Sequence, residues 1–524
     1  MRFSKRAPQR RITTPSGQAG RLSPRRLVAV GAAWSAVPFA VQIVAGLPVA
    51  ALLVREMPIG QYGALASANA LIALIALAGA LGLTPAMARF GAVAFERGGD
   101  DALRDVTRNA SRLARAAGIG VIVLLAGLAA ALASTGSVRT MAAVIAVSIP
   151  AAALTSRTAV ATGFLQVRFR PRQVASSNVT AALARVLVVV VAVVACGLTS
   201  AWEVAAALSL ATIAGFIVLA RGVPRAPLRW HAPAGTPTVR QFLSFGSAMV
   251  LVSASGLAIS QLDVFLVGMI RGRAAAGLYA PASLLANQVV ALAALPASFL
   301  IPQLAAAASR GSHRDVGQLY RWASRWALVL AAPAVGACFA APSQVLTLIY
   351  GSHLRAESAP LRILMAGVLV HLAFGFNGAT MDAYGMAKAM VARSGLGLAV
   401  SAISCAALIP TFGAEGAATA TALGIAVLNV VASIALYRRH GIAPWDRPLV
   451  ACLTAALLAT GAVTAVLGAM HVDALVAVAI GAGTTLAPTL ALSLAAGHGE
   501  DFKRFTQFTR ETVIRRLGTP GAPS

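Results

Sequence analysis

Fourteen apolar stretches, each long enough to cross a bilayer, follow one another between residues 27 and 496. A membrane-spanning helix needs about 20 consecutive apolar residues. The chain is 58% hydrophobic and only 11% charged, whereas a soluble protein carries about 25% charged residues. This pattern predicts that the membrane is the solvent of the protein and that the protein works in or across it.

The stretches are uniformly apolar and do not alternate in polarity. A lone segment in lipid satisfies its backbone hydrogen bonds only as a helix, so each stretch predicts a helix and not a barrel strand. The predicted fold class is an all-α polytopic membrane protein with about 14 transmembrane helices. The predicted spans are 27–53, 64–85, 114–135, 140–163, 174–197, 202–220, 240–270, 278–302, 324–345, 359–382, 392–410, 416–437, 449–470 and 474–496.

Lysine and arginine are divided unequally between the two sides of the predicted membrane. With a cytoplasmic N-terminus, 35 of the 43 lie in inner segments, six in outer loops and two inside spans. Cytoplasmic loops carry such an excess, so both termini are predicted to be cytoplasmic. The net charge of +27 is therefore interpreted as topological, and no nucleic-acid partner is predicted.

An internal repeat relates the two halves of the chain. Three residue pairs around the second and eighth spans share an offset of 217 residues, and the prolines are expected to close those spans: Gly60 and Gly277, Tyr62 and Tyr279, Pro85 and Pro302. The repeat covers six helices, an even number, so both copies have one orientation. This predicts two pseudo-symmetric six-helix lobes related by an axis along the membrane normal.

The repeat and the hydropathy together predict the domain organisation. Each lobe contains six spans, a polar linker joins the lobes, and the last two spans lie outside the repeat. The predicted segments are a disordered basic tail (1–26), an N-lobe (27–220), a linker (221–239), a C-lobe (240–440), helices 13 and 14 (449–496) and an amphipathic cytoplasmic tail (497–524).

Arginines inside the membrane are the main candidates for a binding site. A charge in lipid costs several kcal/mol and marks a functional position by default. Arg157 and Arg185 lie inside spans four and five, and Arg89 lies at the inner end of span two. Facing a central cavity, they would bind an anion such as phosphate, which guanidinium recognises in pairs of hydrogen bonds. The alternative is that they reach the inner lipid headgroups.

A second group of polar residues is predicted near the outer side. Asp263 is expected either to pair with Arg271 or Arg273 at an outer gate that also includes Arg55, or to bind a coupling proton or cation. Polar residues within spans are more often interhelical hydrogen-bond partners than ligands. The polar cavity candidates are Asn69, Gln261, Asn287 and Asn377.

The sequence contains no arrangement typical of an enzyme. We find no nucleophile, base and orienting group that belong together, and no metalloprotease, nucleophile-elbow or phosphate-loop motif. The prediction is a protein that is not an enzyme, has no metal site, and uses no cofactor other than a possible coupling proton or sodium ion.

Two stretches match the pattern of a known family. The first runs from Gly60-Gln61-Tyr62-Gly63 through Leu81-Gly82-Leu83 to Arg89-Phe90. The second includes Leu348-Ile349-Tyr350-Gly351, Asp382-Ala383-Tyr384-Gly385 and Leu408-Ile409-Pro410-Thr411-Phe412-Gly413-Ala414-Glu415-Gly416-Ala417-Ala418-Thr419-Ala420-Thr421. Over residues 27 to 440 the chain resembles the Wzx-type polysaccharide biosynthesis flippases, which belong to the multidrug/oligosaccharidyl-lipid/polysaccharide (MOP) exporter superfamily.

The resemblance implies a fold like that of the MATE exporters of the same superfamily and a substrate class. That class is an oligosaccharide linked to a polyprenyl (di)phosphate, flipped by alternating access across the bacterial cytoplasmic membrane for cell-surface polysaccharide. It implies a monomer that contacts membrane lipids and the polymerase or assembly machinery. No tightly bound cofactor is implied.

Other functions remain as alternatives. A cation-coupled drug exporter usually depends on carboxylates in the first helix, which has none here. A lipid II flippase is closer in chemistry, but its pattern of charges near the second helix is absent. A membrane-embedded enzyme needs large outer loops, and the longest here is 346–358. A channel does not explain the repeat or the buried arginines.

Overall fold

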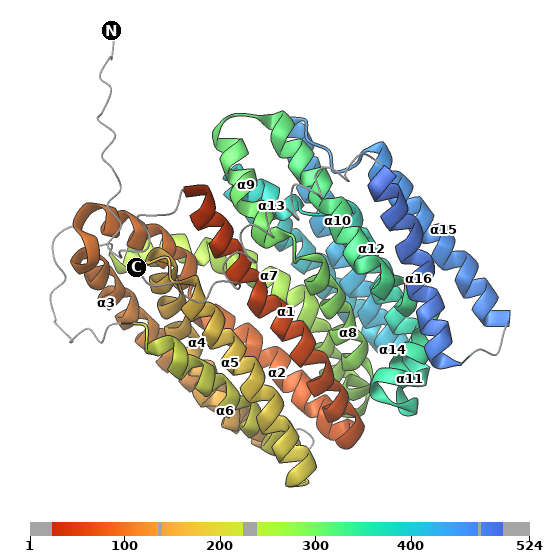
Figure 1. Ribbon diagram of the computed structural model, residues 1–524. Helices are drawn as coiled ribbons and strands as arrows, with labels where there is room; N and C mark the ends of the chain where they lie inside the picture. Colours follow the sequence, from red (N-terminus) through yellow and green to blue (C-terminus); the bar gives the residue numbers. More distant parts are fainter. Residues whose placement is uncertain (1–23, 135–138, 224–237, 470–472, 496–524) are drawn as a thin grey trace, which may run out of the picture.

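The computed structural model describes residues 24–134, 139–223, 238–469 and 473–495, which contain helices and turns but no β-strand. Figure 1 shows α3–α6 on one side and α8–α16 on the other, with α1, α2 and α7 between them. Of the predicted tail 1–26, residues 24–26 belong to α1 and the rest lies outside the described residues, as do 497–524 and most of 221–239. The first six helices are α1 (Pro24–Glu56), α2 (Ile59–Gly79), α3 (Leu83–Ala133), α4 (Arg139–Val167), α5 (Pro171–Val190, extended by the π-helix η3, Val191–Ala195) and α6 (Ala201–Ala220).

The second half of the chain contains more breaks than the first. Its helices are α7 (Val239–Ile270), α8 (Arg273–Ala293), α9 (Ala297–Ser309), α10 (His313–Ala340), α11 (Pro342–Tyr350), the 3₁₀ helix η4 (Ser352–Glu357), α12 (Ser358–Phe374), α13 (Asn377–Ala383), α14 (Ala387–His440), α15 (Arg447–Ala469) and α16 (Ala474–Ser493).

The predicted spans are confirmed as helical, and a break between helices interrupts four of them: 64–85, 278–302, 324–345 and 359–382. Eleven helices in the described part are long and apolar enough to cross a membrane. Two of them, Ile59–Ala133 and Ala387–His440, are 75 and 54 residues long and each contains two predicted spans. A further predicted span, 27–53, corresponds to α1. The chain is therefore a multi-pass membrane protein with the predicted fold class.

Glycine allows the turn inside α14. Gly413 has φ +56° and ψ −125°, a region open almost only to glycine. The chain reverses there, and Gly416 packs so closely that an added Cβ would lie 2.4 Å from the carbonyl oxygen of Leu408. These two glycines explain why two spans follow one another without a loop.

The repeat is present in the structure, but with an offset of 214 residues. Helices α1 and α7 end at Glu56 and Ile270, α2 and α8 are Ile59–Gly79 and Arg273–Ala293, and α3 and α9 begin at Leu83 and Ala297. The predicted offset of 217 is wrong by three residues. Three residues are close to one helical turn, so the sequence match kept the same helix face.

The prolines do not close their spans as predicted. Pro85 is the third residue of α3 and Pro302 the sixth of α9. Instead, α2 breaks at Leu81 and Gly82, which have φ values of 51° and 61°, and α8 breaks before α9. A proline in the first turn of a helix loses no hydrogen bond, which is why Pro85 suits the start of α3.

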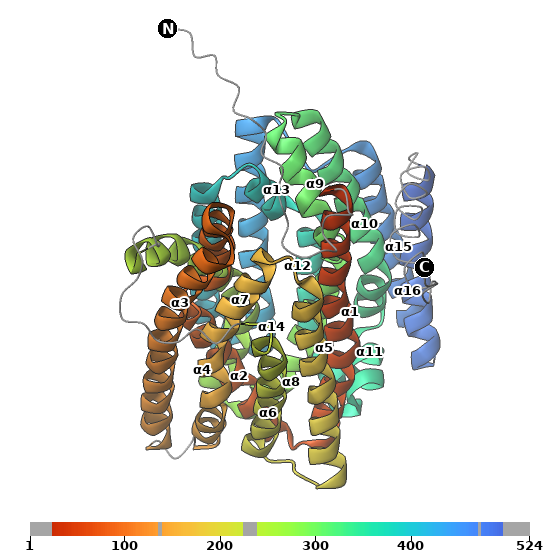
Figure 2. The same ribbon diagram turned by 60° about the vertical axis from the view of Figure 1, so that its left-hand side comes forward.

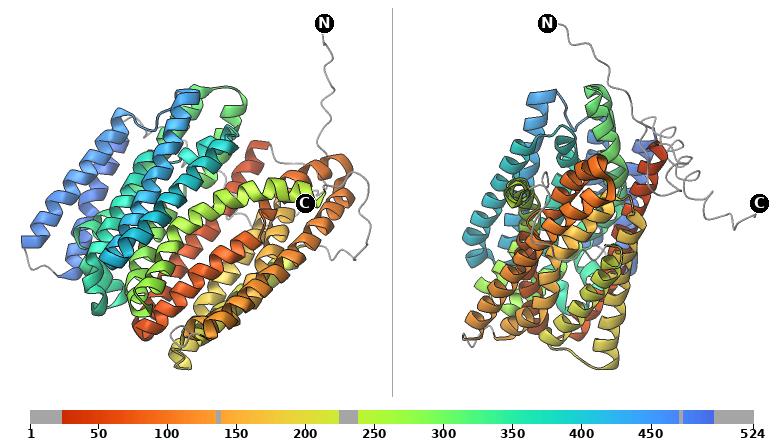
Figure 3. Two further views of the ribbon diagram at one scale, coloured as in Figure 1. Left: turned by 180° about the vertical axis from the view of Figure 1, so that it is seen from behind. Right: turned by 90° about the vertical axis from the view of Figure 1, so that its left-hand side faces the viewer.

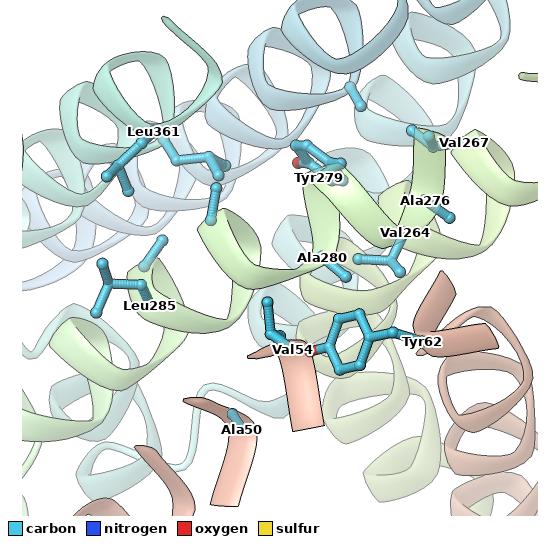
Figure 4. Packing of buried hydrophobic residues seen from close by; sticks show 14 of the residues in the cluster. Ala50, Val54, Tyr62, Val264, Val267, Ala276, Tyr279, Ala280, Leu285 and Leu361 are labelled. Carbon is cyan, nitrogen blue, oxygen red and sulfur yellow. The ribbon is translucent and has the colours of Figure 1, made fainter. Parts of the chain in front are cut away.

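Helices α2 and α8 cross at a pair of glycines that obey this symmetry. A Cβ on Gly63 would lie 1.8 Å from the carbonyl oxygen of Arg273, and one on Gly277 would lie 2.2 Å from that of Ile59. Such reciprocal contact is typical of a two-fold axis. Figure 4 shows Tyr62 of α2 close by, beside Val54 of α1 and Ala280 of α8. The crossing joins the two lobes.

Helix α7 packs against both lobes. Near its start, Gly246 lies against Leu81 and Gly82 at the break between α2 and α3, while its later half packs on α8 and α14. Figure 3 shows α7 running from the C-lobe bundle toward the N-lobe bundle. Although α7 begins the predicted C-lobe, it is the helix that connects the lobes.

Helices α15 and α16 form a pair outside the repeat. They pack mainly on each other and on α10, and Figure 2 shows them at the edge of the C-lobe. Small residues allow close approach: a Cβ on Gly336 of α10 would lie 2.4 Å from the carbonyl oxygen of Gly481. This is the small-residue packing expected between helices in lipid.

Candidate functional site

Arg185 is a half-buried guanidinium in an apolar helix. It lies in the fourth turn of α5, and its buried Nε has no hydrogen-bond partner in the described part of the chain. A buried donor without a partner costs about 1–3 kcal/mol, more when it is charged. The position therefore suits an anionic ligand.

The other two predicted arginines are exposed. Arg157 of α4 has no described hydrogen bond or ion pair. Arg89 lies over the ring of Phe245 of α7, with Cζ 4.8 Å from the ring centroid, a cation–π distance. The three guanidiniums lie on three different helices and share no partner among the described residues. The sequence-based prediction that they form one cavity site stays a prediction.

The arginines of the predicted outer gate bind neutral acceptors. Arg55 Nε donates to the carbonyl oxygen of Ile349 at 3.0 Å, and its Nη2 to that of Leu348. Arg273 donates to Oγ1 of Thr140 at 2.8 Å. Both contacts connect the lobes at one end of the molecule.

Arg271 completes this set within the C-lobe. Its Nη1 donates to the carbonyl oxygen of Pro410 at 3.2 Å, next to the Gly413 turn. None of the three arginines forms a described ion pair. The end of the molecule that carries these three arginines is called the Arg55 end below, and the opposite end the Arg89 end.

The predicted pairing of Asp263 with Arg271 or Arg273 is wrong. Asp263 is 0% exposed, and its Oδ2 accepts from three hydroxyls, of Tyr279 at 2.6 Å, Thr421 at 3.0 Å and Ser283 at 3.4 Å. Position 263 is two helical turns from the end of α7, so its side chain points into the bundle instead of the outer turn. These bonds join α7, α8 and α14.

The four polar candidates have different surroundings. Asn377 donates to Oδ1 of Asn429 at 3.0 Å, and Asn287 donates to the carbonyl oxygen of Ser260 at 3.4 Å. Both therefore connect helices, the role that such residues most often have. Asn69 is exposed near the middle of α2, and Gln261 is half-buried.

Sequence reasoning missed Arg393. Arg393 is one of the 35 lysines and arginines assigned to inner segments, but α14 begins at Ala387, so Arg393 is the seventh residue of that helix. Arg393 is half-buried, and its Nε is buried without a partner in the described part. The sequence carried a signal for this position, because Arg393 and only one other charged residue, Lys388, directly precede a long apolar run.

A small cavity lies at two helix breaks of the C-lobe. It has about 260 Å³ of free volume, part of it open, and lies between α8, α10 and α12. Its lining residues are Val290, Ala293, Ala294, Ala327, His371, Leu372, Gly375 and Phe376. Across the described residues, no group of three His, Cys, Asp or Glu is placed to hold a metal ion.

The long motif near residue 413 joins the turn to Asp263. Gly413 and Gly416 form the turn, and Thr421, five residues later, bonds to Asp263. The motif thus has a structural role that spacing alone did not reveal.

Comparisons with known proteins agree with this fold. Against the lipid II flippase MurJ in an inward closed conformation, the TM-score is 0.66 at 10% identity, over 90% of this chain and 99% of that chain. An inward-facing multidrug resistance MATE transporter gives 0.62 at 14% identity, over 76% and 94%. A MOP superfamily transporter from Pyrococcus furiosus, described as having a binding pocket of reverse polarity, gives 0.59 at 14%, over 82% and 99%.

The sequence comparison identifies the family. No curated protein matches the chain. A family model described as polysaccharide biosynthesis protein matches residues 31–307, more than half of the chain. The match begins in α1 and ends in α9, so it includes the N-lobe and the α2–α8 crossing. The chain therefore belongs to the polysaccharide biosynthesis protein family and has the fold of the MOP transporters.

Proposed function

We propose that this protein flips an oligosaccharide linked to a polyprenyl (di)phosphate across the bacterial cytoplasmic membrane, for the synthesis of a cell-surface polysaccharide. Membership of the polysaccharide biosynthesis family and the MOP transporter fold support a membrane flippase. The lipid-linked sugar is the substrate that agrees with basic side chains inside the membrane.

Arg185 carries the proposal. A guanidinium with a buried, unpartnered Nε is expected to attract phosphate, which accepts several charge-assisted hydrogen bonds. Arg157 and Arg89 would add positive charge on the same side of the membrane. In this mechanism the headgroup is held between the lobes, and the polyprenyl chain stays in lipid.

The orientation follows from charge. The excess of lysine and arginine lies at the Arg89 end, and by the positive-inside rule this supports a cytoplasmic location of that end. The bonds of Arg55 and Arg273 then close the outer side. Release of the headgroup outside requires these bonds to break. A possible coupling proton or sodium ion, a monomeric state and contact with the polymerase or assembly machinery belong to the same proposal.

The first experiment compares a strain lacking this protein with its parent. Surface polysaccharide and the sidedness of polyprenyl-linked sugars are measured together. Loss of polymer, with lipid-linked oligosaccharide accumulating on the cytoplasmic face, is expected. Unchanged polymer and lipid pools would overturn the proposal.

A cation-coupled exporter of small molecules is the second candidate. The observation in its favour is Asp263, a buried carboxylate with three hydroxyl partners and no basic partner among the described residues. Altered sensitivity of the deletion strain to cationic drugs, with normal polysaccharide, would favour this function. A lipid II flippase is the third, and accumulation of peptidoglycan precursor would identify it.

A further inference from the structure

The C-lobe cavity is almost entirely apolar. It lies where α8 ends at Ala293 and where α12 ends before Gly375, which has φ +55°. Irregular backbone at membrane depth occurs where it is buried in protein or lines a cavity. Among the described residues that line the C-lobe cavity, His371 alone has a polar side chain.

A chain of hydrogen bonds fixes the proton position on His371. Asn377 donates to Oδ1 of Asn429, which makes the amide nitrogen of Asn429 a donor. That nitrogen bonds to the carbonyl oxygen of Ile425 at 2.7 Å and to Nδ1 of His371 at 3.2 Å. Nδ1 must therefore accept, so the ring is neutral and carries its hydrogen on Nε2. His371 thus has one free donor, Nε2–H.

Arg393 adds a positive charge at the start of α13, two residues after the lining residue Phe376. Its guanidinium lies on Gly378 of α13, where an added Cβ would be 2.8 Å from Nη2. The buried Nε of Arg393 has no described partner. A donor therefore lies at the apolar wall, and an unsatisfied cation lies on the helix that begins one residue after the lining residue Phe376.

We propose that the Arg393–His371 cavity binds a phosphoryl group attached to an apolar chain. The phosphate oxygens accept from Arg393 and from Nε2 of His371, and the carbons next to the phosphate contact the apolar wall. The inference deepens the proposed function, on which it rests, by giving the C-lobe its own contact with the polyprenyl phosphate. Free phosphate shares the same acceptor chemistry but would leave the apolar wall empty.

The test measures binding to the purified full-length protein in detergent. The probes are farnesyl monophosphate, farnesol and inorganic phosphate, and the readout is the dissociation constant. We expect farnesyl monophosphate to bind at least about tenfold more tightly than either other probe, because only it uses both the cation and the apolar wall.

Two variants and one control locate the site. Arg393→Gln is expected to weaken farnesyl monophosphate binding roughly tenfold, since a hydrogen bond to a charged group is lost. His371→Phe keeps an aromatic ring of similar size, removes the donor, and is expected to weaken binding roughly fivefold. Arg310→Gln changes an exposed arginine of the same lobe and is expected to bind as wild type does.

Several outcomes would overturn the inference. They are equal binding by wild type and both variants, no binding by wild type, and inorganic phosphate that binds as tightly as the lipid phosphate. The proposed function fails separately: if wild type binds through Arg393 but flips no lipid-linked sugar in liposomes, the site stands and the function falls. If wild type flips the substrate and Arg393→Gln binds normally, the function stands and the site falls.

Discussion

Charged side chains inside this protein fall into two kinds: those that have hydrogen-bond partners, and those with a buried donor that has no described partner. Asp263 accepts three hydroxyl bonds and joins three helices. Arg185 and Arg393, by contrast, each leave a buried Nε without a described partner. The first kind is expected to determine stability, and the second to determine binding.

Replacing Arg185 by Gln is expected to reduce flipping about tenfold while the protein still inserts. The change removes a charge-assisted hydrogen bond to the phosphate, and such a bond is worth about 1.5–3 kcal/mol. Flipping is measured in liposomes that contain the lipid-linked oligosaccharide. Arg221→Gln, at an exposed position after α6, is the control. Normal flipping by a well-inserted Arg185→Gln protein would remove Arg185 from the site.

Replacing Thr421 by Val is expected to lower the free energy of unfolding by about 2 kcal/mol, because a buried carboxylate loses one of its hydroxyl donors. Unfolding in mixed detergent micelles measures the difference. Thr419→Val is a matched control, since the Thr419 hydroxyl is exposed and bonds only to its own helix. Equal stability of the two variants would mean that the bond from Thr421 to Asp263 does not contribute to the stability of the protein.

At the scale of helices, the crossing of α2 and α8 depends on two glycines, which have no side chain. Gly63 and Gly277 each lie against a carbonyl oxygen of the other helix. Without a hydrophobic driving force in lipid, such close approach is what holds helices together.

Replacing Gly63 by Ala is therefore expected to destabilise the protein by about 3 kcal/mol, the upper part of the range for overpacking. The added Cβ would lie 1.8 Å from a backbone oxygen that cannot move without the helix. Gly60→Ala, one turn earlier with nothing within 4 Å, should change stability little. Thermal unfolding in detergent compares the two. A Gly63→Ala protein as stable as Gly60→Ala would show that the helices separate easily.

At the scale of the whole molecule, contacts at the Arg55 end hold the lobes together. Arg55 bonds to α11, and Arg273 bonds to Thr140 of α4. Single exposed contacts contribute little energy, so breaking these two bonds is expected to need only a small change in free energy.

The double variant Arg55→Ala/Arg273→Ala is expected to shift the population toward opening at this end. Spin labels on Cys196 and on Ala356→Cys, both exposed, report the distance between lobes, and the other three cysteines are buried. The mean distance should increase by more than about 2 Å. Arg362→Ala removes a guanidinium–carbonyl bond within the C-lobe and should leave the distance unchanged. An unchanged distance in the double variant would contradict this role.

The fold class and the spans could be predicted from the amino-acid sequence alone. Length and hydropathy suffice for this, because lipid leaves a lone segment no alternative to the helix. The motif around Gly413 also indicated the family. The repeat was visible in sequence, but its register was three residues off, since helical periodicity hardly distinguishes such a shift.

The partners of the polar residues could be identified only from the packing of the helices. Asp263 lies eight residues before Arg271 in sequence, yet its partners are Tyr279, Ser283 and Thr421. The direction of a side chain depends on how helices rotate and cross, and hydropathy does not encode that. Arg393 is likewise assigned to an inner segment by its charge, and only its packing against α13 shows that its guanidinium contacts the protein.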